Sequence, residues 1–408
     1  MDKIDNKIVY DLFCNKDLLN YLNINEKEEL TSTYLDKFII GFKDRNLSQE
    51  EVFTLTAEYL ENIINRYSPY LSTLYCSGYD NNFAEIFAKE FTNLNSLVFD
   101  CITITKKNFI SIINNLPHLN SLTLWNIMLA YSKNEEQLDR LKFSRKLRNL
   151  EWMYCYQFEC DVEGPININY HRKSLPLNRF EFMDVLLDTI TSLKSLTWHN
   201  IDEKGTELLS TLLANNKNLS KLSAPLQTLN AQTFKNISNN INLKRLLLLY
   251  AEDEIRLTKD QLINLPHIKS IEIQFSYGEF IDALAPLIQS CENLEELKYF
   301  AFPRCEVNLL NHITTLTKLK ILSINTSRYF PRFLSSILPE SNIEHLEIRS
   351  YYPITINFDI FINWKKLKCI KNTLLIEILE DLEYSSSSED FKDWRMFKYS
   401  DSIQYWRK

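Results

Sequence analysis

A short hydrophobic pattern recurs along most of this chain. An apolar residue is followed three and five positions later by two more, as at Leu94, Leu97 and Phe99. Thirteen copies occur within residues 71–373, and their first residues are mostly 23 to 26 positions apart. A fixed period in this range is typical of solenoid proteins, in which each repeat is one small structural unit. The first residues are Leu71, Leu94, Leu119, Leu147, Leu177, Leu193, Leu219, Leu243, Ile268, Leu294, Leu319, Ile343 and Leu367.

Each copy combines a strand pattern with a helix pattern. The last two apolar positions alternate with polar ones, as residues of a β-strand with one buried face do. The stretch that follows Phe99 places Phe109, Ile112, Ile113 and Leu116 at helical spacing. One strand and one helix cannot enclose a core, but a stack of them can. The pattern therefore indicates an α/β leucine-rich-repeat solenoid, a horseshoe with a parallel sheet on its inner wall and helices outside.

Charge and hydropathy limit the partners and the location. The chain has 46 basic and 53 acidic residues, a net charge of −7, and no basic stripe along the repeats. Neither nucleic acid nor a membrane is therefore expected as a partner. Neither a signal-peptide pattern nor an apolar run long enough to span a membrane is visible. The eight cysteines are scattered, several at apolar repeat positions, which suits reduced thiols in the cytoplasm or nucleus.

The sequence contains no pattern typical of a catalytic, cofactor or metal site. Its five glycines lie too far apart to form a phosphate-binding loop or a dinucleotide fingerprint. Cys155 and Cys160 with His171 lack a CxxC pair and a fourth ligand, so they do not match a zinc site. No catalytic residue, metal or cofactor is therefore predicted, and the chain is not expected to be an enzyme.

Residues 1–45 do not follow the repeat and are predicted to form a small helical head. Within them, residues 17–30 resemble the middle of an F-box, with a Tyr-Leu pair followed four residues later by an acid and then by Leu30. The Leu-Pro opening of that family is absent from residues 8–11. The resemblance implies a substrate-recognition subunit of a cullin-type ubiquitin ligase. Its adaptor-binding residues would be Leu18, Leu19, Leu22 and Leu30.

A second interpretation of the head requires only its apolar pattern. Every solenoid needs a cap over the open end of its core, and short helices in residues 1–45 would serve as one. Under this interpretation the chain is a leucine-rich-repeat interaction scaffold with no link to ubiquitin. Residues 46–70 are predicted to form a junction helix, with a capping box at Ser48 and Glu51.

The chain has two irregular regions outside its head. A change in spacing between Leu147 and Leu193 predicts a protruding loop around residues 157–176. Residues 374–408 combine an acidic, serine-rich break, including the run 385–388, with aromatic residues that are predicted to cap the last repeat.

The predicted binding surface follows from which side chains of each strand point away from the buried core. Residues between and just after the strand leucines should face the concave wall, where large apolar side chains indicate a protein partner or packing against one another. The chain is thus predicted to be a protein–protein interaction module, a monomer outside its complex, with the target protein on this wall. Charged residues expected there are Glu151, Glu181, Asp184, Glu272, Glu347 and Arg349. The predicted partner-binding residues are Trp125, Met153, Tyr154, His199, Tyr250, Phe275 and Phe300.

Overall fold

The structure is a computed structural model in which much of the repeat region is described. The chain divides into two compact units, Met1–Asn216 and Lys217–Lys408. The described residues are 72–77, 92–132, 141–160, 181–182, 190–249, 263–274, 281–300, 313, 316–326, 342–350, 358–374, 393–399 and 402–408.

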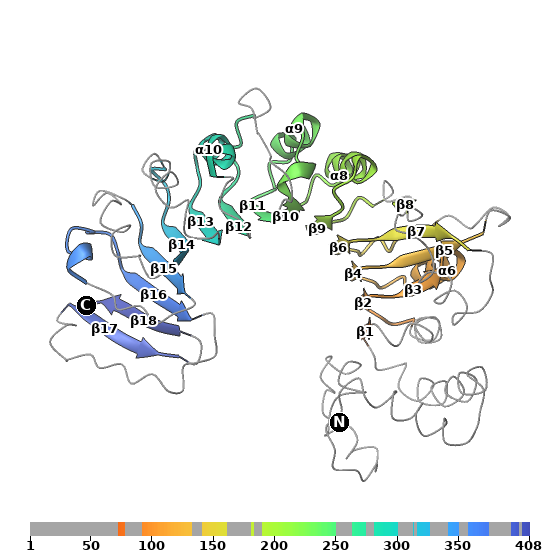
Figure 1. Cartoon of the computed structure of the whole chain (residues 1–408), viewed down its shortest axis with the longest axis horizontal. Helices are drawn as coiled ribbons and strands as arrows, with labels where there is room; N and C mark the ends of the chain where they lie inside the picture. The colour runs from red at the N-terminus through yellow and green to blue at the C-terminus, as the bar shows by residue number, and fades with distance from the viewer. Residues whose placement is uncertain are drawn as a thin grey trace, which may run out of the picture. The chain divides into compact units, whose positions relative to one another are not determined.

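Parallel strands form the main layer of the first unit (Figure 1). Successive strands pair in the same register, so that Leu97 of one strand lies beside Leu122 of the next. The strands in spatial order are β1 (Thr73–Ser77), β2 (Ser96–Asp100), β4 (Ser121–Trp125), β6 (Asn149–Met153) and β9 (Ser195–His199).

The repeat leucines form the core of this unit. Within β2, Leu97 and Phe99 are buried while Val98 between them is partly exposed, as the alternating pattern predicts. The equivalent positions of β6 and β9 hold Trp152 and Trp198, which are fully buried and stack with their ring centroids 6.1 Å apart. Because every strand buries the same phase, the stacked repeats share one continuous core.

A second, smaller sheet forms the next layer of the first unit. It contains β3 (Thr103–Thr105), β5 (Met128–Tyr131) and β7 (Tyr156–Glu159), which pair in parallel, and β8 (Glu181–Phe182), which pairs with β7 in antiparallel fashion. The repeat pattern predicted only helices here. These strands arise because the chain turns sharply after β2, β4 and β6 and then runs extended beside its neighbours.

The sharp turns share one backbone conformation. Cys101, Asn126 and Tyr154, each directly after a strand, have φ angles of 56°, 54° and 53°. Residues other than glycine rarely adopt this left-handed region. The conformation turns the chain so that Ile102, Ile127 and Cys155, the following residues, are buried. Irregular turns were expected from the sequence, but three successive repeats use the same turn.

Helices follow some of the strands in the described part of the chain. In the first unit α6 (Lys106–Asn114) begins after Thr105, whose side chain accepts a hydrogen bond from the Asn108 amide. Helix α8 (Glu203–Asn215) begins after Asp202, whose carboxylate accepts a 2.6 Å hydrogen bond from the Gly205 amide.

The Leu177 copy is not a strand of the main sheet. Strand β6 pairs directly with β9, and the segment after Leu177 contributes β8 to the second sheet instead. Glu181, predicted on the concave wall, therefore lies in that second sheet. Residues 157–159 of the predicted loop at 157–176 belong to β7 instead. Residues 161–180 and Asp184 lie outside the described residues.

The second unit continues the same repeat with parallel strands (Figure 1). Equivalent apolar residues lie side by side here too, as Leu246 does beside Ile271. The parallel strands are β10 (Lys221–Pro225), β11 (Arg245–Leu249), β12 (Ser270–Gln274), β13 (Glu296–Phe300), β14 (Ile321–Thr326), β15 (His345–Ser350) and β16 (Cys369–Leu374).

Some of the described segments between strands of the second unit are short helices. Helix α9 (Ala231–Asn239) starts with a capping box between Asn230 and Thr233. Helix α10 (Ile281–Ser290) contains Pro286, and both helices lie on the same side of the strand layer (Figure 1). Single 3₁₀ turns, η5 (Leu226–Thr228) and η9 (Phe358–Phe361), follow β10 and precede β16.

The second unit ends in an antiparallel pair. Strand β18 (Ser402–Arg407) pairs with β16, and β17 (Trp394–Lys398) pairs with β18 as the outermost described strand. Trp394, Ile403 and Tyr405 of this pair are buried. In the described part of the chain, no helix is long and apolar enough to cross a membrane.

The fold class is an α/β leucine-rich-repeat solenoid, which confirms the main prediction from the sequence. The predicted head at 1–45, the junction at 46–70 and the serine run at 385–388 lie outside the described residues.

Candidate functional site

The inner strand face is the surface formed by side chains that lie between and just after the buried strand positions. In the first unit, strand register lines up Asp100, Trp125, Met153 and His199 at the carboxyl ends of four successive strands. A parallel sheet places equivalent side chains of neighbouring strands about 4.8 Å apart. Three of the predicted partner-binding residues therefore stand in one row.

Tyr154 joins this row from the turn after β6. Its hydroxyl lies 3.3 Å from His199 Nε2, and the centroids of the two rings are 4.4 Å apart. The side chains of Trp125 and Tyr154 are 46% and 41% exposed, in contrast to the buried Trp152. We call Trp125, Met153, Tyr154 and His199 the aromatic ridge.

A hollow of about 410 Å³ lies against the aromatic ridge. Trp125 and Tyr154 both line it, in agreement with the strand phase, which predicted that the two rings stand within reach of each other. Its other lining residues are Asp100, Cys101, Asn126 and Tyr156.

The left-handed turns fix the backbone of the ridge. The Cys101 amide donates to the Trp125 carbonyl at 2.7 Å, and the Asn126 amide donates to the Met153 carbonyl at 2.8 Å. The Asn126 side-chain amide also donates to Cys101 Sγ at 3.4 Å. These bonds join successive turns in a ladder, so the rings project from a rigid support and do not lie on a free loop.

An acidic residue, Asp100, is the first member of the row in chain order. The Tyr75 hydroxyl donates to Asp100 Oδ2 at 3.0 Å, and Asp100 lines the hollow.

Tyr156 also lines the hollow. Burial raises the pKa of Tyr156, and the negative charge of Asp202 raises it further. Tyr156 therefore stays protonated at neutral pH and offers a phenolic hydrogen-bonding group.

Three of the described cysteines, Cys155, Cys291 and Cys369, are not activated nucleophiles. Burial raises the pKa of the Cys155 thiol strongly, and hydrogen bonding with the backbone of Ile127 and Met153 offsets this effect only in part. Burial also raises the pKa of Cys291 to about 12 and that of Cys369 to about 11. Thiols at such values are protonated at neutral pH and react slowly. Within the described residues, no cluster of His, Cys, Asp and Glu could hold a metal ion.

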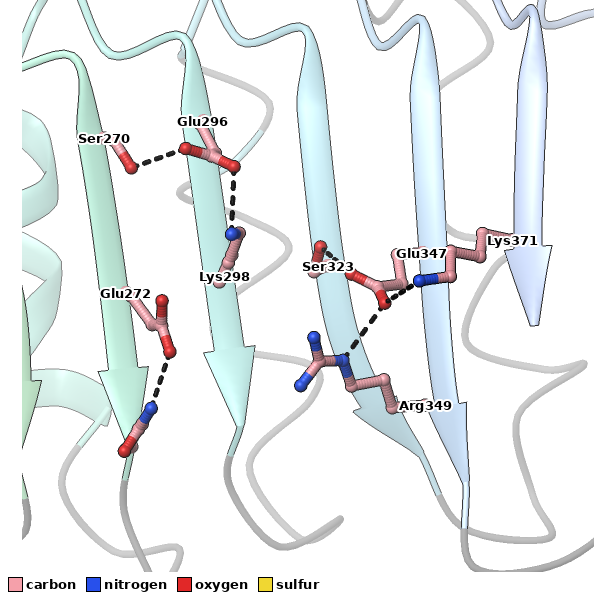
Figure 2. Close-up of polar contacts among 9 residues, drawn as sticks. Ser270, Glu272, Glu296, Lys298, Ser323, Glu347, Arg349 and Lys371 are labelled. Carbon is pink, nitrogen blue, oxygen red and sulfur yellow. Dashed lines mark hydrogen bonds and ion pairs between the residues drawn. The ribbon is translucent and has the colours of Figure 1, made fainter. Parts of the chain in front are cut away.

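Among the described residues of the second unit, linked polar side chains lie on the inner strand face (Figure 2). Ser270 donates to Glu296 at 2.6 Å and Lys298 lies 3.2 Å from the same carboxylate. Gln274 donates to Glu272 at 2.6 Å, and both residues lie on β12, the strand that also contains Ser270. We call these residues and the cluster around Glu347 the polar ladder.

Glu347 is the centre of the second half of the polar ladder (Figure 2). It accepts a 2.8 Å hydrogen bond from Ser323 and lies 3.2 Å from Arg349 and 3.4 Å from Lys371. Burial favours its protonated form, but the Ser323 hydrogen bond and the two cations outweigh burial and lower its pKa. The carboxylate is therefore ionised at neutral pH, and its charge is compensated inside the sheet face.

The ring of Phe300 is covered by a side chain of the same unit. The Arg349 guanidinium lies over its ring at 4.2 Å from the centroid, a cation–π arrangement that reaches from β15 across β14 to β13. Because Arg349 pairs with Glu347 at the same time, Phe300 belongs to the polar ladder more than to an open apolar surface.

The structure brings together four of the seven predicted partner-binding residues. Phe300 lies in the other unit, while Tyr250, Phe275 and the predicted adaptor-binding residues Leu18, Leu19, Leu22 and Leu30 lie outside the described residues. Several residues that line the hollow or hold it were not predicted from the sequence, because only strand register and the repeated turn place them there. They are Tyr75, Asp100, Cys101, Asn126 and Tyr156.

Comparisons with known proteins show similarity to solved structures. No family model and no curated protein matches the chain. Among solved structures, the chain is similar to one described as the crystal structure of a TLR13–ssRNA13 complex, with 15% identity and a TM-score of 0.36. The match covers 71% of this chain and 44% of that one, so the chain spans less than half the length of the protein it matches.

Proposed function

We propose that this chain is a protein-interaction module and that the aromatic ridge is its principal contact surface. The observation that carries the proposal is the pair of large rings, Trp125 and Tyr154, which stay about half exposed beside one hollow. Exposed aromatic side chains are uncommon on surfaces that contact only water, and they dominate the binding energy of protein interfaces.

The support under the ridge strengthens this proposal. Cys101, Asn126 and Tyr154 adopt left-handed backbone angles, each of which costs about 1–2 kcal/mol for a residue other than glycine. Such strained positions cluster at functional sites. A ridge held in place by main-chain hydrogen bonds also loses little conformational entropy when a partner binds.

The polar ladder is the weaker candidate for a primary contact. Glu296 and Glu347 already have cationic and hydroxyl partners on their own sheet face. A partner would have to replace these interactions, and exchanging one set of ion pairs for another adds little net affinity. The ladder fits the rim of an interface or the stabilisation of neighbouring repeats.

Replacing Trp125 with alanine is expected to weaken partner binding about thirtyfold, because a buried anchor of this kind carries about 2 kcal/mol. Partners would be recovered with the tagged full-length chain, identified by mass spectrometry, and titrated against purified protein. The melting temperature should change little, since the Trp125 side chain is half exposed. Ile241→Ala removes an exposed apolar side chain elsewhere and should leave affinity unchanged. Unchanged affinity for Trp125→Ala would contradict the proposal.

A finer proposal concerns the head. The resemblance of residues 17–30 to an F-box supports a role as the substrate-recognition subunit of a cullin-type ubiquitin ligase, with the aromatic ridge holding the target protein. The alternative is an interaction scaffold with no link to ubiquitin. The free thiols among the described cysteines suit either role in a reducing compartment, the cytoplasm or nucleus.

Replacing Leu22 and Leu30 together with glutamate tests the finer proposal. If these leucines form the adaptor contact, two charges in that apolar interface should abolish adaptor binding in a pull-down with purified adaptor subunit. The circular dichroism spectrum should stay unchanged, and Trp125→Ala should still bind the adaptor. If the unmodified chain does not bind the adaptor, the ubiquitin role is wrong and the scaffold proposal stands.

A further inference from the structure

Strand β17 leaves one edge of its backbone unpaired in the described part of the chain. On its other edge it pairs with β18, where Tyr399 N–H donates to the Ser402 carbonyl and Lys408 N–H donates to the Asp393 carbonyl. In an antiparallel pair, every second residue directs its main-chain groups toward the partner strand. The register therefore directs the N–H and C=O groups of Met396 and Lys398 away from β18, to the outer edge.

Apolar side chains flank this free edge. Four large hydrophobic residues here are exposed, and three of them are aromatic: Met396, Phe397, Tyr399 and Trp406. Phe397, Tyr399 and Trp406 line a hollow of about 520 Å³ together with Arg395, Arg407 and Lys408. An exposed edge with large apolar side chains is a template for pairing with another strand.

The charged side chains within β17 are both positive. Arg395 and Lys398 are exposed and form no ion pair within the described residues. Arg407 differs from them: it donates to the Trp364 carbonyl at 2.7 Å and its guanidinium stacks over the Trp394 ring at 5.5 Å. Arg395 and Lys398 alternate on the two faces of β17, so the edge presents a cation on each face.

We propose that the β17 edge binds an extended acidic segment of a partner protein, which adds a strand to the sheet. Main-chain hydrogen bonds to Met396 and Lys398 supply affinity, and carboxylates opposite Arg395 and Lys398 supply selectivity. A second copy of the chain fits less well, because pairing two β17 strands would bring together Arg395 and Lys398 of both copies, and β17 itself contains no acidic residue. This site is independent of the aromatic ridge.

A short synthetic peptide is a direct probe of strand addition. We choose acetyl-Val-Glu-Val-Ile-Glu-Val-amide carrying fluorescein, which places one carboxylate and two aliphatic side chains on each face of an extended strand. Fluorescence anisotropy with the full chain should show an affinity for this peptide at least about tenfold higher than for a control peptide that has lysine in place of both glutamates.

Three variants separate main-chain pairing from charge. Met396→Pro removes an outward N–H that β18 does not use, so the strand should still fold and affinity should fall about tenfold or more. Met396→Ala keeps the N–H and should bind within about threefold of the unmodified chain. The double variant Arg395→Glu and Lys398→Glu should prefer the lysine peptide. Trp125→Ala should bind the acidic peptide normally, whatever its effect at the ridge.

Several results would overturn the proposal. One is absence of binding of the acidic peptide at concentrations up to about 1 mM. Equal affinity of Met396→Pro and Met396→Ala would show that the backbone edge is not used. A concentration-dependent dimer in light scattering that Met396→Pro abolishes, without peptide binding, would assign the edge to self-association. Circular dichroism and thermal melting of every variant would exclude unfolding as the cause of lost binding.

Discussion

Replacing Trp152 with alanine is expected to lower the free energy of unfolding by about 4 kcal/mol, which is among the largest effects of a single core substitution. Trp152 is fully buried and stacks on Trp198 of the adjacent strand, with the ring planes 14° apart. Removing the indole leaves a cavity between two repeats that the rigid parallel strands cannot close. Urea denaturation followed by circular dichroism measures the loss.

Two control variants make this prediction specific. Trp152→Phe keeps an aromatic ring in the stack and removes an indole N–H that has no hydrogen-bond partner, so it should cost much less than alanine. Trp125→Ala removes the same side-chain type from the inner strand face and should be nearly neutral, because that ring is half exposed. Equal destabilisation by Trp125→Ala and Trp152→Ala would mean that the assigned strand register is wrong by one residue.

Replacing Asn216 with alanine is expected to destabilise the first unit by about 3 kcal/mol, although it removes only a small polar side chain. Asn216 Oδ1 accepts a 2.9 Å hydrogen bond from the Leu193 amide. Its Nδ2 donates to the Ile190 and Leu212 carbonyls at 2.8 and 2.9 Å. The side chain is buried, so alanine would leave the Leu193 amide and the Ile190 carbonyl without this partner and without water, while the Leu212 carbonyl keeps its hydrogen bond from the Asn216 main-chain amide.

The same exchange at an exposed position is the control. Asn242 donates one hydrogen bond to the Lys217 carbonyl at 3.0 Å at the surface, where water can replace it. Asn242→Ala should therefore cost less than about 1 kcal/mol. Hydrogen exchange should show faster exchange at the Leu193 amide in Asn216→Ala alone. If both variants lose the same stability, the buried network does not stabilise the helix–strand connection as proposed here.

The strand phase was predictable because it depends on a single local rule. Leu97 and Phe99, or Leu122 and Leu124, stand two residues apart, and adjacent side chains of a strand point to opposite faces. Burial of these pairs fixes the face of the residue between and after them. For this reason the residue pattern alone places Trp125, Met153 and His199 in one row, and the strand register agrees.

The Leu177 copy shows the limit of this rule. Its residues satisfy the apolar spacing as well as others do, yet β6 pairs with β9 and the segment contributes β8 to the second sheet. Spacing of apolar residues identifies a segment that can bury one face, but it does not say which neighbouring strand completes the hydrogen bonds. That choice depends on contacts between residues far apart in the sequence.

The sequence by itself determined the repeat, the buried phase of each strand and the aromatic character of the exposed positions, because all three depend on residue type at short, regular intervals. The tertiary structure decided which rings share a hollow, how the left-handed turns at Cys101, Asn126 and Tyr154 hold them, and which backbone edge of β17 has no partner strand among the described residues. These features arise from hydrogen bonds between different repeats. A single repeat does not specify them, since its own residues are compatible with several neighbours.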